Sequence, residues 1–152
     1  MAATSIFVNF PTTDLERSKA FYTALGFTIN PLFTDENGAC VVLSDTIYFM
    51  VLTKEYLGTF TDKQIIDPKT QAQMSIALSR DSRDEVDVAL ERGLAAGGSE
   101  PREAQDYGFM YSRDLDDPDG NTLSFLYMEP QAAEQGPEAY MAAQGADAPA
   151  TA

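Results

Sequence analysis

The first apolar and polar alternation in the chain predicts a β-strand. In "SIFVNFP", residues 5–11, the side chains of Ile6, Val8 and Phe10 would share one face, and those of Phe7 and Asn9 would share the other. The next residues, "TDLERSKAFYTALGF", change to helical spacing. The start of the chain therefore predicts a strand that leads directly into a helix.

The predicted helix has signals at both ends. Thr13 and Glu16 have the spacing of a capping box, and Gly26 follows the last apolar position as a stop signal. Between them lies an apolar stripe at helical spacing, made of Leu15, Phe21, Tyr22 and Leu25.

Three further strands are expected after this helix. They cover about 28–34, 39–43 and 46–53, and Asn37-Gly38 gives a hairpin signal between the first two. Residues 54–70 are polar and irregular and predict a linker, with a short helix near 54–59.

The second half repeats the order of the first. A strand is expected from about residue 72, a helix after Ser82 and Glu85, and a stop at Gly97-Gly98. "YGFMYSRDL" and "NTLSFLYM" then predict a hairpin around "DPDG", whose Pro118 and Gly120 suit a type I turn.

The spacing of the matching signals indicates an internal duplication. The offset is 69 residues from Thr13 to Ser82 and 71 from Gly26 to Gly97. The predicted fold is α+β, with two tandem βαβββ modules that form a curved, mostly antiparallel sheet around a concave cavity. One domain would span 1–130, with module one at 5–60 and module two at 70–130. An Ala-rich tail at 131–152 would be flexible or docked on a partner, with Tyr140 and Met141 as its anchor.

Composition narrows the chemistry. The chain has no histidine, which removes the usual general base near neutral pH, Ser-His-Asp and Cys-His catalysis, and the commonest ligand of transition metals. A net charge of −14 argues against nucleic acid as a partner and would favour cationic ligands. A lone cysteine, Cys40, no signal peptide and no membrane-spanning apolar run together predict a cytoplasmic protein with a buried thiol.

The ordered set of "TDLERSKAFYTALGF", "ALERGLAAGG" and "DPDGN" within two βαβββ modules resembles the vicinal oxygen chelate superfamily, over about residues 5–130. That superfamily includes glyoxalase I, extradiol dioxygenases and bleomycin-binding proteins. The resemblance implies a concave face on each sheet, helices on the convex side and a homodimer.

Metal-dependent members hold one divalent ion in the concavity through His, Gln and Glu. The resemblance implies that the four ligand positions fall on Phe7, on Met50 or Tyr48, on Ser75 and on Ser124. None of these residues is a carboxylate or an imidazole, and a register slip of two would bring in only the amides of Asn9 or Gln73. We therefore expect no metal and no cofactor.

Strand parity predicts which side chains line the cavity instead. With Asp116 paired to Asn121 across the turn, Arg113 would lie opposite Ser124, Tyr111 opposite Leu126 and Phe109 opposite Met128. The functional role of Arg113 would then be to anchor a carboxylate, but the favoured interpretation is that it is solvated or paired with Asp114 or Asp116. The full set of expected cavity residues is Phe7, Asn9, Tyr48, Met50, Ser75, Phe109, Tyr111, Arg113 and Ser124. The aromatic members also suit a core or a dimer interface.

Three functions agree with this pattern. The first is metal-free binding of a small organic molecule in the cavity, by a homodimer that contacts neither nucleic acid nor membrane. The second is a glyoxalase- or dioxygenase-like enzyme with a non-standard site. The third is a structural dimer whose cavity is filled by its own side chains.

Overall fold

The computed structural model describes residues 3–145, so residues 146–152 of the predicted tail lie outside it. Module one runs in the order strand, helix, three strands. Its elements are β1 (Ile6–Thr12), α1 (Leu15–Ala24), β2 (Thr28–Asn30), the 3-10 turn η1 (Pro31–Phe33), β3 (Gly38–Val42) and β4 (Ile47–Thr53). The short helix α2 (Lys54–Leu57) opens the linker, as the sequence predicts.

Module two repeats this order after the linker. Its elements are β5 (Ser75–Ser79), α3 (Arg83–Ala95), β6 (Gln105–Asp106), β7 (Met110–Asp116) and β8 (Thr122–Met128). The predicted α+β fold of two tandem βαβββ modules is confirmed. None of the helices within residues 3–145 combines the length and apolar character needed to cross a membrane.

Each module has its own four-stranded sheet. The strand orders are β1-β4-β3-β2 and β5-β8-β7-β6, so equivalent strands occupy equivalent places. β1 pairs with β4 and β5 with β8 in parallel, and the other pairs are antiparallel. The structure therefore has two mixed sheets, one in each module, where the sequence analysis expected a single curved, mostly antiparallel sheet.

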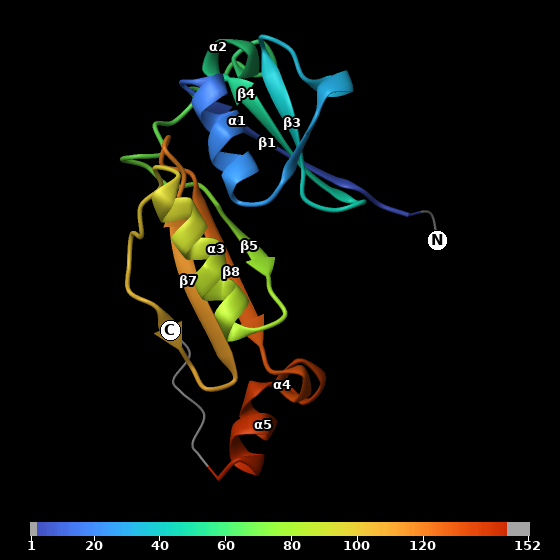
Figure 1. The fold of residues 1–152 in the computed structure, drawn as a ribbon, viewed down its shortest axis with the longest axis vertical. Helices are drawn as coiled ribbons and strands as arrows, with labels where there is room; N and C mark the ends of the chain where they lie inside the picture. The colour runs from blue at the N-terminus through green and yellow to red at the C-terminus, as the bar shows by residue number, and fades with distance from the viewer. Residues whose placement is uncertain (1–2, 146–152) are drawn as a thin grey trace.

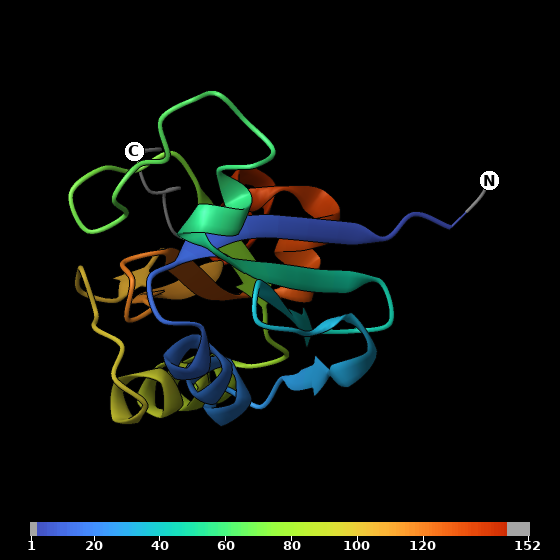
Figure 2. The ribbon, with the colours of Figure 1, turned by 90° about the horizontal axis from the view of Figure 1, so that it is seen from above.

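Both helices cover the same side of the molecule. Figure 1 shows module one above module two along the longest axis, with α1 above α3, and Figure 2 shows both helices on the same side of the sheets. One apolar core lies beneath the helices and crosses from module to module: Phe10, Tyr22 and Phe49 from module one join Leu90 and Phe125 from module two. The opposite faces of the sheets, which carry no helix, are the concave faces of the sequence analysis.

The caps are only partly as predicted. Asp14, not Thr13, is the N-cap of α1, and its carboxylate accepts from the Arg17 amide at 3.0 Å. Thr13 has another role because its hydroxyl and amide donate to Asp119. In α3 the predicted cap is confirmed, since Ser82 Oγ accepts from the Glu85 amide.

Other local differences have simple causes. The strand expected over 28–34 ends at Asn30, because Pro31 has no amide proton and opens the 3-10 turn. The tail contains two short helices in its described part, α4 (Pro130–Gln135) and α5 (Pro137–Ala143). Each begins with proline, which suits the first helical position, and continues with good helix formers. Figure 1 shows both helices beyond the end of module two that is distant from module one.

The predicted register of the β7–β8 hairpin is wrong by one residue. Asp116 pairs with Thr122, not with Asn121, and the Asp117 amide donates to the Asn121 carbonyl at 2.8 Å. The predicted turn is present, since the Gly120 amide donates to the Asp117 carbonyl. The loop between Asp117 and Asn121, however, has three residues, 118–120. Gly120 closes it with a φ of +99°, a conformation that favours glycine.

Candidate functional site

The concave face of module one carries the residues that strand parity predicts. Phe7 lies beside Tyr48 and Asn9 beside Met50 in the β1–β4 pair. The Phe7 and Tyr48 rings stack with their centroids 4.7 Å apart, yet Phe7 is 55% exposed. Within one described chain this apolar surface has no cover.

The concave face of module two holds a different set from the predicted one. Ser124 lies between Ala77 on β5 and Asp114 on β7, and Ser75 lies beside Thr122. Asp114 is buried, Arg102 Nε donates to its Oδ2, and its Oδ1 has no hydrogen-bond partner in residues 3–145. Sequence reasoning missed Asp114 because the register was one residue off.

The same shift removes three residues from the predicted cavity. Arg113 pairs with Phe125 and Tyr111 with Tyr127, so both face α3. Phe109 precedes β7, and its carbonyl accepts from the Glu129 amide at 2.8 Å. The prediction that Phe109, Tyr111 and Arg113 line the concave face is therefore wrong, because the turn holds three residues rather than four.

Arg113 has a structural role, because neighbouring carboxylates accept its hydrogen bonds. Its guanidinium donates to both oxygens of Glu100 at 3.0 Å and to Asp87 on α3 at 2.9 Å. The hydrogen bonds that Arg113 donates to Glu100, and then the one to Asp87, raise its pKa further above an already high value. Tyr111 donates to the same Asp87 oxygen at 2.7 Å. The group therefore ties α3 to β7 and leaves no donor fork for a ligand in the cavity.

The "DPDG" turn joins the two modules through buried carboxylates. Asp117 accepts from the Tyr22 hydroxyl at 2.7 Å, and Asp119 accepts from the Thr12 hydroxyl at 2.6 Å and from Arg17 at 3.0 Å. Asp117 and Asp119 are both only 4% exposed. Burial raises the pKa of Asp117 and outweighs the hydrogen bonds from Tyr22 and Asn121, which lower it.

For Asp119 the balance has the opposite sign. Burial alone would raise its pKa, but hydrogen bonds from Thr12 and Thr13 and the charge of Arg17 outweigh burial and hold that pKa below its ordinary value. The turn is thus structural, as the sequence indicates, and it fastens module two to module one.

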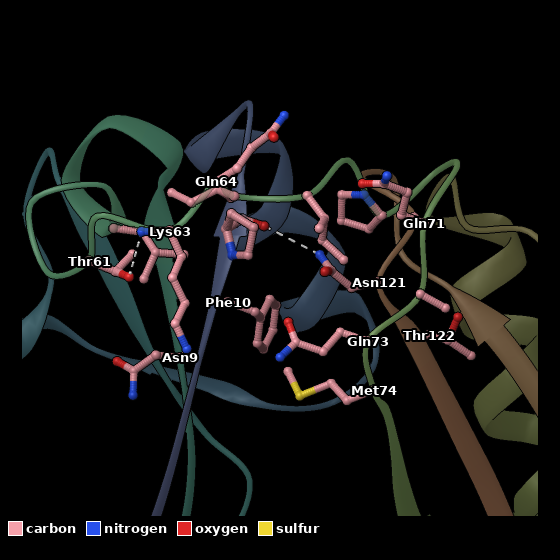
Figure 3. Close-up of a pocket in the computed structure, with 17 residues that line it drawn as sticks. Asn9, Phe10, Thr61, Lys63, Gln64, Gln71, Gln73, Met74, Asn121 and Thr122 are labelled. Atoms are coloured by element: carbon pink, nitrogen blue, oxygen red, sulfur yellow. Dashed lines mark hydrogen bonds between the residues drawn. The ribbon is translucent and has the colours of Figure 1, made fainter.

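A cavity of about 250 Å³ lies at this junction, beneath the linker. Its walls come from residues 9–11 of β1, from residues 120–122 at the end of the turn and from linker residues between 57 and 74. Figure 3 shows the linker passing over the opening, with Gln73 and Met74 near the Phe10 ring. The volume is slightly below the range of about 300–1,000 Å³ for ligand pockets.

The cavity wall combines apolar and carboxamide groups. The apolar members include Phe10, Leu57, Ile65, Ile66 and Met74, and the carboxamides are Asn9, Gln64, Gln71, Gln73 and Asn121. The Asn121 amide donates to the Pro11 carbonyl at 3.3 Å and to Asp117 at 3.0 Å, which fixes it in the wall. Apolar walls with a few placed polar groups are typical of a small-molecule site.

Only Asn9 of the nine expected cavity residues lines this cavity. Gln73, which the sequence analysis weighed only as an alternative for a shifted register, lines it as well. Phe7, Tyr48, Met50, Ser75 and Ser124 are on β1, β4, β5 and β8 but outside its wall. The linker residues were missed because their sequence has no periodicity. The available signal was their charge, since three of the chain's four lysines are Lys54, Lys63 and Lys69.

The residues present do not fit the metal that the fold family implies. Phe7, Met50 or Tyr48, Ser75 and Ser124 offer no charged donor to a divalent ion. Asp114 and Asp116 do share the face of Ser124, but Asp114 is paired with Arg102 and Asp116 accepts from the Thr122 hydroxyl. Within residues 3–145 no three His, Cys, Asp or Glu side chains form a group that would hold a metal ion.

Comparisons with known proteins agree with this architecture. Residues 4–44 match the family model described as bleomycin resistance protein-like N-terminal. A search of curated protein sequences gave no match.

Solved structures share the fold at low sequence identity. A hypothetical protein from S. aureus is 24% identical with a TM-score of 0.70, covering 84% of this chain and 95% of that one. A glyoxalase/bleomycin resistance protein/dioxygenase family enzyme from Burkholderia phytofirmans is 18% identical with a TM-score of 0.68, covering 83% and 99%. A bleomycin resistance determinant encoded on the transposon Tn5 is 21% identical with a TM-score of 0.57, covering 84% and 99%.

These matches agree with the resemblance to the vicinal oxygen chelate superfamily that the sequence motifs indicate: the solved structures share the fold, and the family model matches residues 4–44. The residues that match the family model include β1, α1, β2 and β3 of module one.

Proposed function

We propose that this chain is a metal-independent binding protein that takes a small organic molecule into the cavity beneath the linker. The observation that carries the proposal is the cavity itself, whose wall joins both modules and combines apolar side chains with five carboxamides.

Metal independence rests on the donor chemistry. The positions that correspond to family ligands hold two hydroxyls, an aromatic ring and a thioether or phenol, and the chain has no histidine. Elemental analysis of the purified protein tests this part. A divalent metal bound in one-to-one ratio would contradict it.

Binding is tested by thermal shift against a library of small aromatic and polar compounds. A ligand that binds only the folded state raises the melting temperature by mass action. Asn9→Phe would place a ring into the cavity and should abolish the shifts. Thr28→Phe is the matched control, because Thr28 is exposed on an edge strand of the same sheet and lies outside the cavity wall. If no compound shifts the wild-type protein, the binding function is wrong.

A homodimer is part of the proposal. The exposed Phe7 ring, stacked on the half-buried Tyr48, forms an apolar patch across β1 and β4 that a second copy would cover. Light scattering tests the assembly, and Phe7→Glu should convert a dimer to a monomer. A wild-type monomer at all accessible concentrations would contradict it.

A cytoplasmic location also belongs to the proposal. Cys40 is free and buried, and burial raises the pKa of its thiol, which suits a structural cysteine in a reducing compartment. Fractionation of cells that express the protein tests the location.

A further inference from the structure

The charge of the cavity wall differs from that of the chain. The chain has a net charge of −14, yet no lining residue is a carboxylate and one, Lys63, is a cation. Figure 3 shows the Lys63 side chain reaching from the linker down toward Asn9 on β1. A positive group and several amides therefore face a partly apolar space in which no acidic side chain competes for them.

The other linker lysines surround the same region. A second cavity of about 220 Å³ shares Pro11, Ile66 and Pro68 with the first and is lined by Lys54 and Lys69. The carboxylates in its wall are Asp67 and Asp119. Both are occupied, since Asp67 accepts from the Lys69 amide and Asp119 accepts from Thr12, Thr13 and Arg17.

These lysines also differ from the remaining lysine in their pairing. Lys19 on α1 forms an ion pair with Glu16 at 2.8 Å. Across residues 3–145, Lys54, Lys63 and Lys69 form no ion pair. In a chain with 24 acidic residues, the linker thus brings together three lysines that have no ion-pair partner among the described residues.

We infer that the ligand of the cavity beneath the linker is a small organic anion with an apolar body, of the carboxylate class. This inference rests on the proposed binding function and deepens it. Lys63 supplies the charge, and the amide groups of Asn9 and Gln73 supply N–H donors for the second carboxylate oxygen. Ile65, Ile66 and Met74 cover the apolar body.

The inference reverses the expectation drawn from net charge. An acidic surface favours cations at long range, but screening removes most of that effect beyond about 8 Å at physiological salt. Within the cavity the nearest charges decide, and the charge in its wall is positive. A cationic ligand would have to enter beside Lys63 without any lining carboxylate to balance it.

The test compares three one-ring probes that differ only in charge and polarity: benzoate, benzamide and benzylamine. Titration calorimetry on the full-length protein should give the tightest binding for benzoate. Lys63→Gln should weaken benzoate binding about fivefold, the size expected for a partly solvated ion pair, and should leave benzamide binding unchanged. Lys19→Gln is the matched control and should alter neither, because Lys19 lies on α1 outside the cavity.

Each result decides the inference. Equal or tighter binding of benzamide or benzylamine overturns the anionic ligand and leaves the proposed binding function standing. A benzoate preference that survives Lys63→Gln, or that Lys19→Gln reduces equally, overturns the role of Lys63. If none of the probes binds while neutral library compounds do, the inference alone fails. If nothing binds at all, the proposed function fails with it.

Discussion

The carboxylate of Asp119 accepts a hydrogen bond of 2.6 Å from the hydroxyl of Thr12, which lies 107 residues earlier in the chain. Thr12 ends the first strand of module one, and Asp119 lies in the last hairpin turn of module two. Both residues are buried. This contact belongs to a network with Thr13, Arg17 and Ser18 that binds the two modules together.

Asp119→Ala should lower the free energy of unfolding by about 3 kcal/mol, because Thr12, Ser18 and Arg17 each lose a hydrogen bond to a buried carboxylate. Urea denaturation measures the loss. Asp62→Ala is the control, since Asp62 is exposed in the linker, and it should change stability by less than about 0.5 kcal/mol. Equal effects of the two substitutions would contradict the role of the turn.

The pKa of Asp119 gives the stability a pH dependence of known sign. Because this pKa is below its ordinary value, the contribution of Asp119 is fully present above the unfolded-state pKa of about 4 and is lost as the pH falls through the folded-state pKa. Asp117 has a raised pKa, so its contribution to the pH dependence of stability has the opposite sign. This contribution is present in both wild type and Asp119→Asn and cancels in their difference. The difference in unfolding free energy between these two proteins should therefore shrink below about pH 4. A constant difference down to pH 2 would contradict this assignment.

Tyr22→Phe tests the second contact of the turn. The Tyr22 side chain is fully buried, and its hydroxyl donates to Asp117 at 2.7 Å, so its loss should destabilise the protein by about 1–2 kcal/mol. Tyr56→Phe is the matched control because Tyr56 is 37% exposed and its hydroxyl makes no hydrogen bond in residues 3–145. Thermal unfolding of both variants checks the difference.

Gly120 connects the turn to the linker above the cavity. A Cβ at this position would lie 2.7 Å from the Lys69 amide nitrogen and 2.8 Å from the Pro68 carbonyl carbon, both of them backbone atoms. Gly120→Ala should therefore displace the linker, with hydrogen exchange increasing over residues 58–74. Gly97→Ala has almost the same φ, +103°, but its Cβ would meet nothing within 4 Å. Gly120→Ala should destabilise the protein by about 1–3 kcal/mol more than Gly97→Ala, which isolates the collision from the backbone strain.

Arg113→Met separates structure from binding. It removes the hydrogen bonds to Glu100 and Asp87 and should lower stability by about 1–2 kcal/mol, while ligand affinity should not change because Arg113 faces α3. Arg92→Met is the control, since Arg92 is exposed on α3 and forms no ion pair within residues 3–145. Loss of binding in Arg113→Met at full stability would restore Arg113 to the site.

The fold was readable from the sequence where side-chain periodicity and caps agree. The alternation around Val8 and Phe10, the stripe of Phe21 and Tyr22 and the stop at Gly26 all correspond to observed elements. These signals are local. The register of a hairpin is not, because it depends on how many residues the turn encloses, and a change of one residue moves every side chain to the other face.

That single residue explains most of the errors at the site. The predicted register placed Arg113 opposite Ser124 and Tyr111 on the concave face. The observed register places Asp114 opposite Ser124 and Tyr111 on the face toward α3. The cavity beneath the linker could not be predicted from the sequence, for another reason. Its wall depends on a polar segment, 57–74, which is held in place by tertiary contacts such as that of Gly120 with Lys69.

The network around Asp119 also gives the two modules unequal roles during synthesis of the chain. The corresponding turn of module one, at Ser44, Asp45 and Thr46, is exposed. Only the turn of module two contacts the other module. Asp119, the partner of Thr12 and Ser18, is therefore synthesised 107 and 101 residues after them. We therefore expect that a nascent module one lacks the carboxylate partner of Thr12 and Ser18 and forms these hydrogen bonds only after the last hairpin has been synthesised.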